Sequence, residues 1–283
     1  MMEFYKYQGA GNDFLIGDNR DGGLNLSPED VRRLCDRRYG VGADGLMLLE
    51  NCPGKDFRMV YFNSDGSGGM MCGNGGRCIA AYAADMASSG APSVRERPVH
   101  LDFEAPDGPH EAYVLADGTV RLRMKNVDGI RVIDGNSYFL NTGTRHYVKF
   151  VPDAEACDVV GEGRIIRNLP EFAPEGTNVN FVSVPGGDGL SDVSRTIYVR
   201  TYEKGVEDET FACGTGIVAS AIASYCHSYD GHKHADSVRY EVQAKKDSLA
   251  VDFIPQLSGN EANCRFTDVW LTGPAAYVAR IIV

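Results

Sequence analysis

The chain of 283 residues lacks the features that define several protein classes. It has no apolar run near the roughly 18 residues that a membrane span needs. Its first residues, 1–6, lack the charged and then apolar layout of a signal peptide. Basic residues are in the minority, since 28 lysines and arginines face 39 aspartates and glutamates. Nucleic-acid-binding surfaces are basic, so we expect a cytoplasmic protein with neither a membrane nor a nucleic-acid partner.

Cofactor and metal signatures are also missing. None of the eight cysteines forms a Cys-x-x-Cys pair, which removes support for zinc ribbons and thioredoxin-like redox motifs. There is no Gly-Lys-Ser/Thr, and Gly9-Ala10-Gly11 lacks the third glycine of the dinucleotide fingerprint. His232 and His234 have no further ligands beside them in a polar stretch. We therefore expect no metal and no nucleotide, and most cysteines should be buried small residues.

One short motif occurs twice. Cys72-Gly73-Asn74-Gly75 is matched 141 residues later by Cys213-Gly214-Thr215-Gly216. Each copy opens a helix-like run of small residues and follows an apolar strand with a polar loop. The unit of strand, loop, Cys-Gly and helix is therefore repeated, which predicts two similar halves. The strands are expected at 57–62 and 196–202, and the helical runs include 79–84 and 218–223.

The rest of the chain predicts a strand-rich protein with few helices. Ser27 is a good N-cap, Pro28 suits the first helical position, and Asp30 completes a capping-box-like pair, with Gly40 as the expected end of that helix. Hairpins are expected at Asp117-Gly118 and around Asp134. An ordinary surface turn is expected at 185–189. Further strands are expected at 46–49, 112–115, 120–124, 131–133, 138–140, 147–151, 179–184, 238–242, 249–254 and 277–283.

The repeated cysteines have a chemical interpretation. A helix N-terminus carries about half a positive charge and unpaired N–H groups, so Cys72 and Cys213 should be more acidic than an ordinary cysteine. The same N–H groups can hold a carboxylate. Two such turns that face each other could invert an amino-acid α-carbon without a cofactor, one sulfur acting as base and the other as acid. The alternative is that both are structural cysteines in Gly-rich bends, which the repeat makes the weaker interpretation.

Several further motifs carry a likeness to a known family. The chain resembles the diaminopimelate epimerases, cofactor-independent enzymes of bacterial and plant lysine biosynthesis, from end to end. The two Cys-Gly-x-Gly motifs in order with the N-terminal Gly-Asn-Asp-Phe make the resemblance specific. The matching segments are Gly9–Phe14, Gly40–Gly45, Phe62–Ser67, Met71–Cys78, Asn178–Phe181, Arg200–Glu203 and Ala212–Gly216.

The resemblance implies an α/β (α+β) fold with two similar domains. Each would be a mostly antiparallel sheet wrapped around a central helix, with the active site in the cleft between them. The domains would comprise residues 1–128 plus 273–283, and 129–272. The implied reaction is epimerisation of LL-2,6-diaminopimelate to the meso form, in lysine and peptidoglycan precursor biosynthesis. It would need no pyridoxal phosphate, no other cofactor and no metal.

The resemblance also implies the site residues. Cys72 and Cys213 would be the acid–base pair, with His146 and Glu203 assisting. Backbone groups of the two Cys-Gly turns would hold the reacting carboxylate, and asparagines would hold the far end of a dicarboxylic diamino acid. From the residues alone, Asn12 could instead satisfy a turn, His146 could make a structural hydrogen bond, and Glu203 could form an exposed ion pair with Lys204. The expected substrate-binding residues are Asn12, Asn63, Gly73, Asn74, Thr144, Asn178, Glu203, Lys204, Gly214 and Thr215.

Two positions depart from the family pattern. Thr144 stands where the family has an asparagine, and Lys204 where it has an arginine, which binds a carboxylate with two parallel hydrogen bonds. One hypothesis is that Arg145 compensates for Lys204. Two alternatives stay open: a related racemase with another substrate, and a binding-only homologue. Proline racemases carry a histidine where this chain has Asn74, which favours diaminopimelate. The oligomeric state also stays open, with a homodimer as one alternative.

Overall fold

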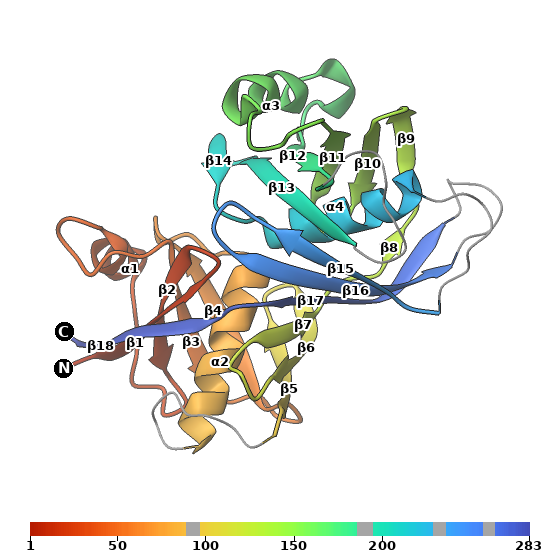
Figure 1. Ribbon diagram of the computed structural model, residues 1–283. Coiled ribbons are helices and arrows are strands. Elements are labelled where there is room, and N and C mark those ends of the chain that lie inside the picture. Colours follow the sequence, from red (N-terminus) through yellow and green to blue (C-terminus); the bar gives the residue numbers. More distant parts are fainter. Residues whose placement is uncertain (89–96, 186–194, 229–235, 257–263) are drawn as a thin grey trace. The chain divides into compact units, whose positions relative to one another are not determined.

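The computed structural model describes the chain as two compact units. The first comprises Met1–Arg123 and Thr272–Val283, and the second comprises Met124–Leu271. Each unit is a sheet that curves around one long helix, α2 in the first and α4 in the second (Figure 1). The domain boundaries expected from the sequence, after residues 128 and 272, stay a prediction. The described residues are 1–88, 97–185, 195–228, 236–256 and 264–283.

Among its described residues, the first unit contains eight strands in the order β18-β1-β2-β3-β4-β5-β6-β7. Only the β2–β3 and β4–β5 pairs are parallel, and each is connected through a helix, as parallel neighbours require. The bounds are β1 Glu3–Gly9, β2 Asn12–Asp18, α1 Pro28–Cys35, β3 Gly45–Glu50, β4 Phe57–Asn63, α2 Gly73–Ser88, β5 Val99–Ala105, β6 Gly108–Val114, β7 Val120–Arg123 and β18 Ala276–Ile282.

The second unit repeats this plan. Its strands follow the order β9-β10-β11-β12-β13-β15-β16, with β14 also paired to β13 and β17 to β8. The bounds are β8 Val127–Asp128, β9 Arg131–Asp134, β10 Ser137–Asn141, β11 Arg145–Phe150, α3 Val159–Arg167, a 3-10 turn Pro170–Phe172, β12 Asn178–Ser183, β13 Thr196–Glu203, β14 Asp208–Thr210, α4 Gly214–His227, β15 Val238–Gln243, β16 Ser248–Gln256 and β17 Arg265–Gly273.

In both units, antiparallel and parallel strand pairs alternate in the same order. From β1 to β6 the successive pairs are antiparallel, parallel, antiparallel, parallel and antiparallel. The pairs from β10 through β13 to β15 and β16 alternate in the same way. Helices α1 and α3 occupy corresponding connections, as do α2 and α4. The repeat predicted from the two cysteine motifs therefore extends over whole domains.

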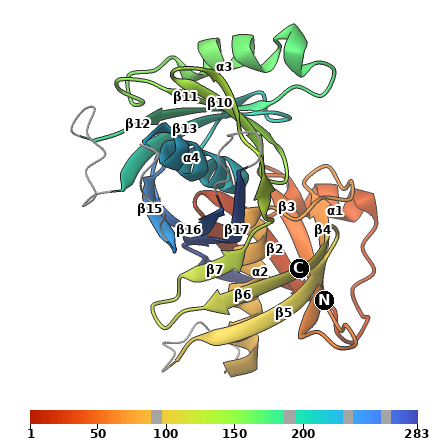
Figure 2. The same cartoon turned by 90° about the vertical axis from the view of Figure 1, so that its right-hand side faces the viewer.

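Small residues allow the strands to approach the two central helices closely. Helix α2 contacts β1, β2, β3, β6, β7 and β18, and α4 contacts β10 to β13, β15 and β16 (Figure 2). Almost the whole of α4 from Gly214 to Tyr225 is buried. Burial of an isoleucine such as Ile217 or Ile222 contributes about 1.5–3 kcal/mol to stability. The buried hydroxyls of Ser220 and Ser224 donate to carbonyls four residues earlier, at 2.8 Å.

Most predicted elements are confirmed to within one to three residues at their ends. Ser27 and Asp30 form the capping box that the sequence indicates, and both hairpins are present. The prediction that this helix extends to Gly40 is wrong, because α1 ends at Cys35. The Asp36 carboxylate accepts the N–H groups of Arg38 and Tyr39, which turns the chain away from the helix. The sequence did not predict β1, β2, β5, β8, β14, β17 or α3.

Two predictions fall outside the described residues. They are most of the turn expected at 185–189 and the histidine pair His232 and His234. Among the described residues, no helix has the length and apolar character to cross a membrane.

Candidate active site

Cys72 and Cys213 lie at equivalent positions, each immediately before the central helix of its unit. The carbonyl of Cys72 accepts the N–H of Gly76, and that of Cys213 accepts the N–H of Ile217, both at 2.8 Å. These are the first hydrogen bonds of α2 and α4, so both cysteines are N-cap residues. The Gly75 N–H also donates to Cys72 Sγ at 3.3 Å. Each sulfur is thus next to the positive end of a helix dipole.

Other cysteines lie in surroundings that favour the thiol. Burial raises the pKa of Cys35 to about 11, with smaller contributions from nearby Asp13 and Asp44. Burial also raises the pKa of Cys78 and of Cys157. Because the thiolate is the reactive form, these three cysteines are poor candidates for proton transfer.

The predicted asparagines of the first unit lie at strand and helix ends. Asn12 opens β2 after a two-residue turn in which Ala10 and Gly11 have φ of 53° and 83°, as a type I′ hairpin requires. Asn63 ends β4, opposite Gly45 at the start of β3. Its Nδ2 donates to Ser67 Oγ at 3.0 Å, within the turn that follows. Asn12 and Asn63 therefore lie at the same end of the sheet.

Arg77 is buried near the start of α2. It lies in a matching motif, but the sequence did not predict a role for it. Its guanidinium donates to Asn74 Oδ1 at 2.9 Å, to the Gly73 carbonyl at 3.1 Å and to the Pro274 carbonyl at 3.3 Å. The Asn74 side chain is therefore engaged within the protein. A role in binding a ligand would fall to backbone groups of this turn.

An ion cluster next to Asn12 was also not predicted. Arg37 donates to both oxygens of Asp13 and to Asp44, while Lys6 pairs with Asp13 at 2.8 Å. Arg37 and Lys6 hold the pKa of Asp13 well below its usual range, although partial burial opposes this effect. The N–H groups of Asp13 and Asp44 also donate to each other's carboxylates. The cluster ties the start of β2 to the loop before β3.

In the second unit, the Asn178 side chain forms hydrogen bonds with the start of β11 and with the residue that follows β13. Its Oδ1 accepts the N–H of Lys204 at 2.8 Å. Its Nδ2 donates to the Arg145 carbonyl at 3.1 Å and lies 3.4 Å from Thr144 Oγ1. The exposed Thr144 precedes β11, Asn178 opens β12, and Lys204 follows β13. These positions correspond to those of Asn12, Gly45 and Asn63 in the first unit.

His146 is fully buried and makes three side-chain hydrogen bonds. Its Nε2 is 2.9 Å from both Thr144 Oγ1 and Thr215 Oγ1, and its Nδ1 is 3.1 Å from Asn180 Nδ2. Burial, with a smaller effect of the positive charge of Lys204, lowers the pKa of His146 to about 3. His146 is therefore a neutral imidazole near pH 7. Thr215 Oγ1 is in turn 3.5 Å from Cys213 Sγ.

Asn180 and Thr201 are buried polar residues that sequence reasoning missed as site residues. Asn180 Nδ2 also donates to the Tyr147 carbonyl at 3.2 Å, and its Oδ1 accepts from Thr201 Oγ1 at 3.0 Å. A usable signal existed, because side chains two residues apart on a strand point to the same face. Asn180 follows Asn178 by two residues on β12 and so faces the same side.

Glu203 ends β13 and is only partly exposed. Burial raises the pKa of its carboxyl group. Among the described ion pairs there is none between Glu203 and Lys204. The partial burial of Glu203 also argues against the exposed pair that the sequence left open. Arg145, by contrast, forms an exposed ion pair with Glu175 at 2.9 Å. Within the described residues, no group of three or more His, Cys, Asp and Glu side chains could hold a metal ion.

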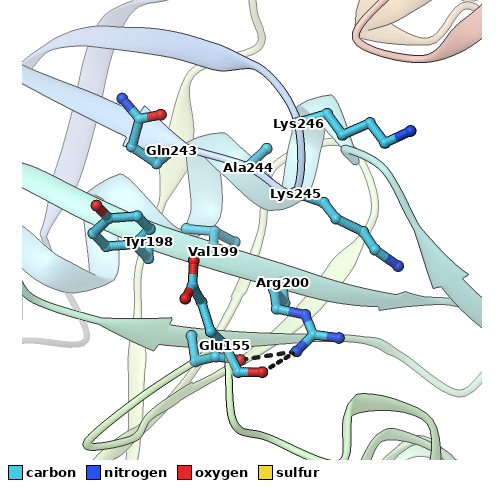
Figure 3. Close-up of a pocket in the computed structure, with 9 residues that line it drawn as sticks. Glu155, Tyr198, Val199, Arg200, Gln243, Ala244, Lys245 and Lys246 are labelled. Carbon is cyan, nitrogen blue, oxygen red and sulfur yellow. Dashed lines mark hydrogen bonds between the residues drawn. The ribbon is translucent and has the colours of Figure 1, made fainter.

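A separate cavity of about 350 Å³ lies in the second unit and shares no residue with the predicted site (Figure 3). Arg200 donates to the Ala154 and Glu155 carbonyls at its wall, and pairs with the largely buried Glu209 at 2.6 Å. Lys245 also pairs with Glu209, at 2.8 Å. Because these cations are already paired, the arrangement braces β13, β14 and the β15–β16 turn. The cavity is lined by Ala154, Glu155, Tyr198, Val199, Arg200, Gln243, Ala244, Lys245 and Lys246.

Replacing Glu209 by glutamine is expected to destabilise the protein by about 1–3 kcal/mol, because two cations lose a charged acceptor. Hydrogen bonds from Arg200 lower the pKa of Glu209 in the folded state. The contribution is therefore fully present above the unfolded pKa of about 4.3 and is lost as the pH falls from there through the lower pKa of the folded state. Denaturation at pH 7 and pH 3 should show the difference from wild type shrinking at the lower pH.

The matched control is Glu175→Gln, which removes the exposed partner of Arg145. Such a surface pair contributes about 0–1 kcal/mol. Equal losses in the two variants would contradict a bracing role for Glu209.

The fold belongs to a class of known proteins. The Bacillus anthracis phenazine biosynthesis protein of the PhzF family has a TM-score of 0.70 at 15% identity, covering 100% of this chain and 98% of that chain. A probable proline racemase from Agrobacterium radiobacter with bound carbonate has a TM-score of 0.64 at 16% identity, covering 100% and 93%. The architecture is therefore the two-domain fold shared by the PhzF proteins and proline racemases.

Sequence comparison identifies the family within that class. The family model described as diaminopimelate epimerase matches residues 4–128 and 138–252. The chain belongs to the diaminopimelate epimerase family, whose members are isomerases. It is 41% identical over 281 residues to the diaminopimelate epimerase of Flavobacterium psychrophilum, covering 98% of both chains. It is also 41% identical over 276 residues to that of Chlorobaculum tepidum, covering 96% of this chain and 97% of the relative.

Proposed function

We propose that this chain epimerises LL-2,6-diaminopimelate to meso-diaminopimelate, with Cys72 and Cys213 as the two proton carriers. The observation that carries the proposal is the matched position of the two cysteines, each the N-cap of the central helix in one of two duplicated units. The family membership supplies the substrate class. We further propose a cytoplasmic location, a role in lysine and peptidoglycan precursor biosynthesis, and domain boundaries after residues 128 and 272.

The proposed reaction is a two-base proton transfer. One sulfur, as thiolate, takes the α-proton, and the electron pair of the broken C–H bond stays on carbon. The other sulfur, as thiol, gives its proton to the opposite face of the same carbon. Each turnover thus exchanges the protonation states of Cys72 and Cys213. No electron donor, electron acceptor or cofactor is needed for the atoms and charges to balance.

The helix starts supply the electrostatic support that the carbanion needs. The α-proton of an amino acid is very weakly acidic, and preorganised donors aimed at the developing charge are the strongest available help. Backbone N–H groups of Gly73, Asn74, Gly214 and Thr215 would hold the reacting carboxylate at two positive helix ends. In this scheme His146 and Glu203 assist: neutral His146 acts as a hydrogen-bond donor and not as a charged acid.

The far end of the substrate would meet the residues that depart from the family pattern. Exposed Thr144 and Lys204 lie on either side of Asn178. Lys204 would attract the distal carboxylate as a point charge, and Asn12 and Asn63 would contribute from the first unit. Arg145 already pairs with Glu175, which argues against its compensating for Lys204.

Incubation with a panel of amino acids in deuterated water tests the proposal. The α-hydrogens of LL- and meso-diaminopimelate are expected to exchange, with inversion, while those of proline and of monocarboxylic diamino acids are not. Mass spectrometry and chiral chromatography measure both events. Exchange confined to another amino acid would indicate a related racemase, and saturable binding of diaminopimelate without exchange would indicate a binding-only homologue.

A further inference from the structure

We propose that Asn180 and Thr201 fix His146 as an imidazole protonated on Nε2, and thereby orient the Thr215 hydroxyl as a hydrogen-bond donor to the sulfur of Cys213. The catalytic consequence rests on the proposed function, whereas the hydrogen-bond arrangement does not. Asn180 and Thr201 are positioning residues in this account, since neither contacts the sulfur.

The orientation of the Asn180 amide follows from its carbonyl partner. A backbone carbonyl can only accept, so the atom 3.2 Å from the Tyr147 oxygen must be the Asn180 NH₂ group. The amide oxygen then points to Thr201, whose hydroxyl donates to it at 3.0 Å. All three side chains of this arrangement, Asn180, Thr201 and His146, are buried, so water cannot replace these partners cheaply.

The tautomer of His146 follows in turn. The Asn180 NH₂ group is 3.1 Å from Nδ1 and can only donate, so Nδ1 must accept and carries no proton. A neutral imidazole then has its proton on Nε2. The His146 ring is buried, and none of its described hydrogen-bond partners is a carboxylate. Both features keep the ring neutral, in agreement with the lowered pKa of His146.

The Nε2 proton sets the direction of the hydroxyls. Nε2 lies 2.9 Å from both Thr144 Oγ1 and Thr215 Oγ1, and neither hydroxyl can donate to it. The Thr215 hydrogen is left with two described acceptors, Thr144 Oγ1 at 3.1 Å and Cys213 Sγ at 3.5 Å. If Thr215 accepts from both His146 and Thr144, the sulfur is the remaining acceptor for its own hydrogen among the described partners. A thiolate favours this arrangement, because a negative acceptor strengthens a hydrogen bond.

As a consequence, the Thr215 hydroxyl is already oriented to donate a hydrogen bond to Cys213 when the sulfur is a thiolate. A hydrogen bond to the charged form favours that form, so the arrangement raises the thiolate fraction of Cys213. All of its members belong to the second unit. Cys72 receives a backbone N–H from Gly75 instead, so it should not depend on Asn180, Thr201 or Thr215.

Nitrogen NMR of histidine side chains in the whole protein tests the tautomer, with His146→Gln to assign the signal. The expected spectrum shows Nε2 protonated and Nδ1 unprotonated between about pH 5 and pH 8, the range in which an ordinary histidine titrates. A proton on Nδ1, or titration within that range, would overturn the inference. This measurement is independent of substrate, so the proposed function can fail or stand separately.

Alkylation of Cys213 by iodoacetamide, followed by peptide mass spectrometry, tests the link to the sulfur. Thr215→Val removes the hydroxyl and so lowers the thiolate fraction of Cys213. At a fixed pH below the pKa of Cys213, the alkylation of this residue is expected to be about five- to tenfold slower. Thr215→Ser keeps the hydroxyl and should react at nearly the wild-type rate. Cys72 in the same samples is the internal control and should be unaffected.

Two further variants test the positioning residues. Asn180→Asp replaces a donor at Nδ1 by an acceptor, which should move the His146 proton to Nδ1 and slow Cys213 alkylation as Thr215→Val does. Should that variant fail to fold, Thr201→Val keeps shape and removes only the donor to Asn180, with a smaller slowing in the same direction. Unchanged Cys213 alkylation in folded Thr215→Val would overturn the proposed link whatever the tautomer.

Discussion

Replacing Cys72 or Cys213 by alanine is expected to lower the rate of diaminopimelate epimerisation by at least about 10²–10⁴-fold, the contribution of a positioned acid or base. Each variant loses the group that serves one face of the α-carbon, so inversion in both directions should be lost together. Steady-state assays with chiral separation of LL- and meso-diaminopimelate measure the loss. Circular dichroism and thermal denaturation establish that the variants fold.

The remaining sulfur gives this experiment a second readout. In Cys72→Ala the Cys213 sulfur can still remove a proton from its own face and return one to the same face. Each single variant should therefore retain slow exchange of the α-hydrogen with deuterated water at the centre of one configuration, without inversion. Cys52→Ala is the control, because Cys52 is not part of either helix start, and it should keep wild-type turnover. Inversion by either Cys72→Ala or Cys213→Ala within a few-fold of wild type would contradict the two-base scheme.

Replacing Gly216 by alanine is expected to destabilise the protein by about 1–3 kcal/mol, the usual cost of overpacking, and to impair turnover. A Cβ at this position would lie 2.3 Å from Asn180 Oδ1 and 3.3 Å from His146 Cε1. Asn180 cannot rotate away without breaking its hydrogen bonds to Thr201, His146 and the Tyr147 carbonyl. Chemical denaturation measures the stability change.

The duplication supplies a matched control for this substitution. Gly75 occupies the equivalent position in α2, where an added Cβ would meet only ordinary contacts of 3.4–3.5 Å, including one with Cys72 Sγ. Gly75→Ala should therefore leave stability unchanged or raise it by up to about 1 kcal/mol, the helix-propensity difference between the two residues. Equal destabilisation by the two substitutions would contradict the close packing described around Gly216.

Much of the fold could be predicted because the duplication is visible in short local patterns. Cys-Gly-x-Gly before a run of small residues predicted both central helices, and short apolar segments bounded by turn residues predicted most strands. Strand β1 was missed because its aromatic residues Phe4, Tyr5 and Tyr7 are interrupted by Lys6 and flanked by polar residues, so no continuous apolar run marks it. Helix α3, with a glycine at 161 and another at 163, has weak helical propensity and is stabilised by packing against β12 and β13.

The candidate site was predicted in two ways. The repeated motif indicates the two cysteines, whereas His146 came only from the family resemblance, and the sequence does not reveal the partners of His146. The roles of the cysteines and His146 in catalysis stay a prediction. Asn180 and Thr201 lie on different strands, and only the register of β12 against β13 places them opposite each other. Arg77 and the cluster around Asp13 were missed for a related reason, because their hydrogen-bond partners lie in other elements or at backbone carbonyls that sequence does not reveal.

The distribution of deuterium after a single passage through the wild-type protein tests the central claim most directly. LL-diaminopimelate with protium at both α-carbons is converted in deuterated water, and product and remaining substrate are separated early in the reaction. If two sulfurs act on opposite faces, meso product should carry one deuterium at the inverted carbon, while the remaining LL substrate retains protium. Product that retains its original protium would show that one group removes and returns the same proton, and would contradict the account.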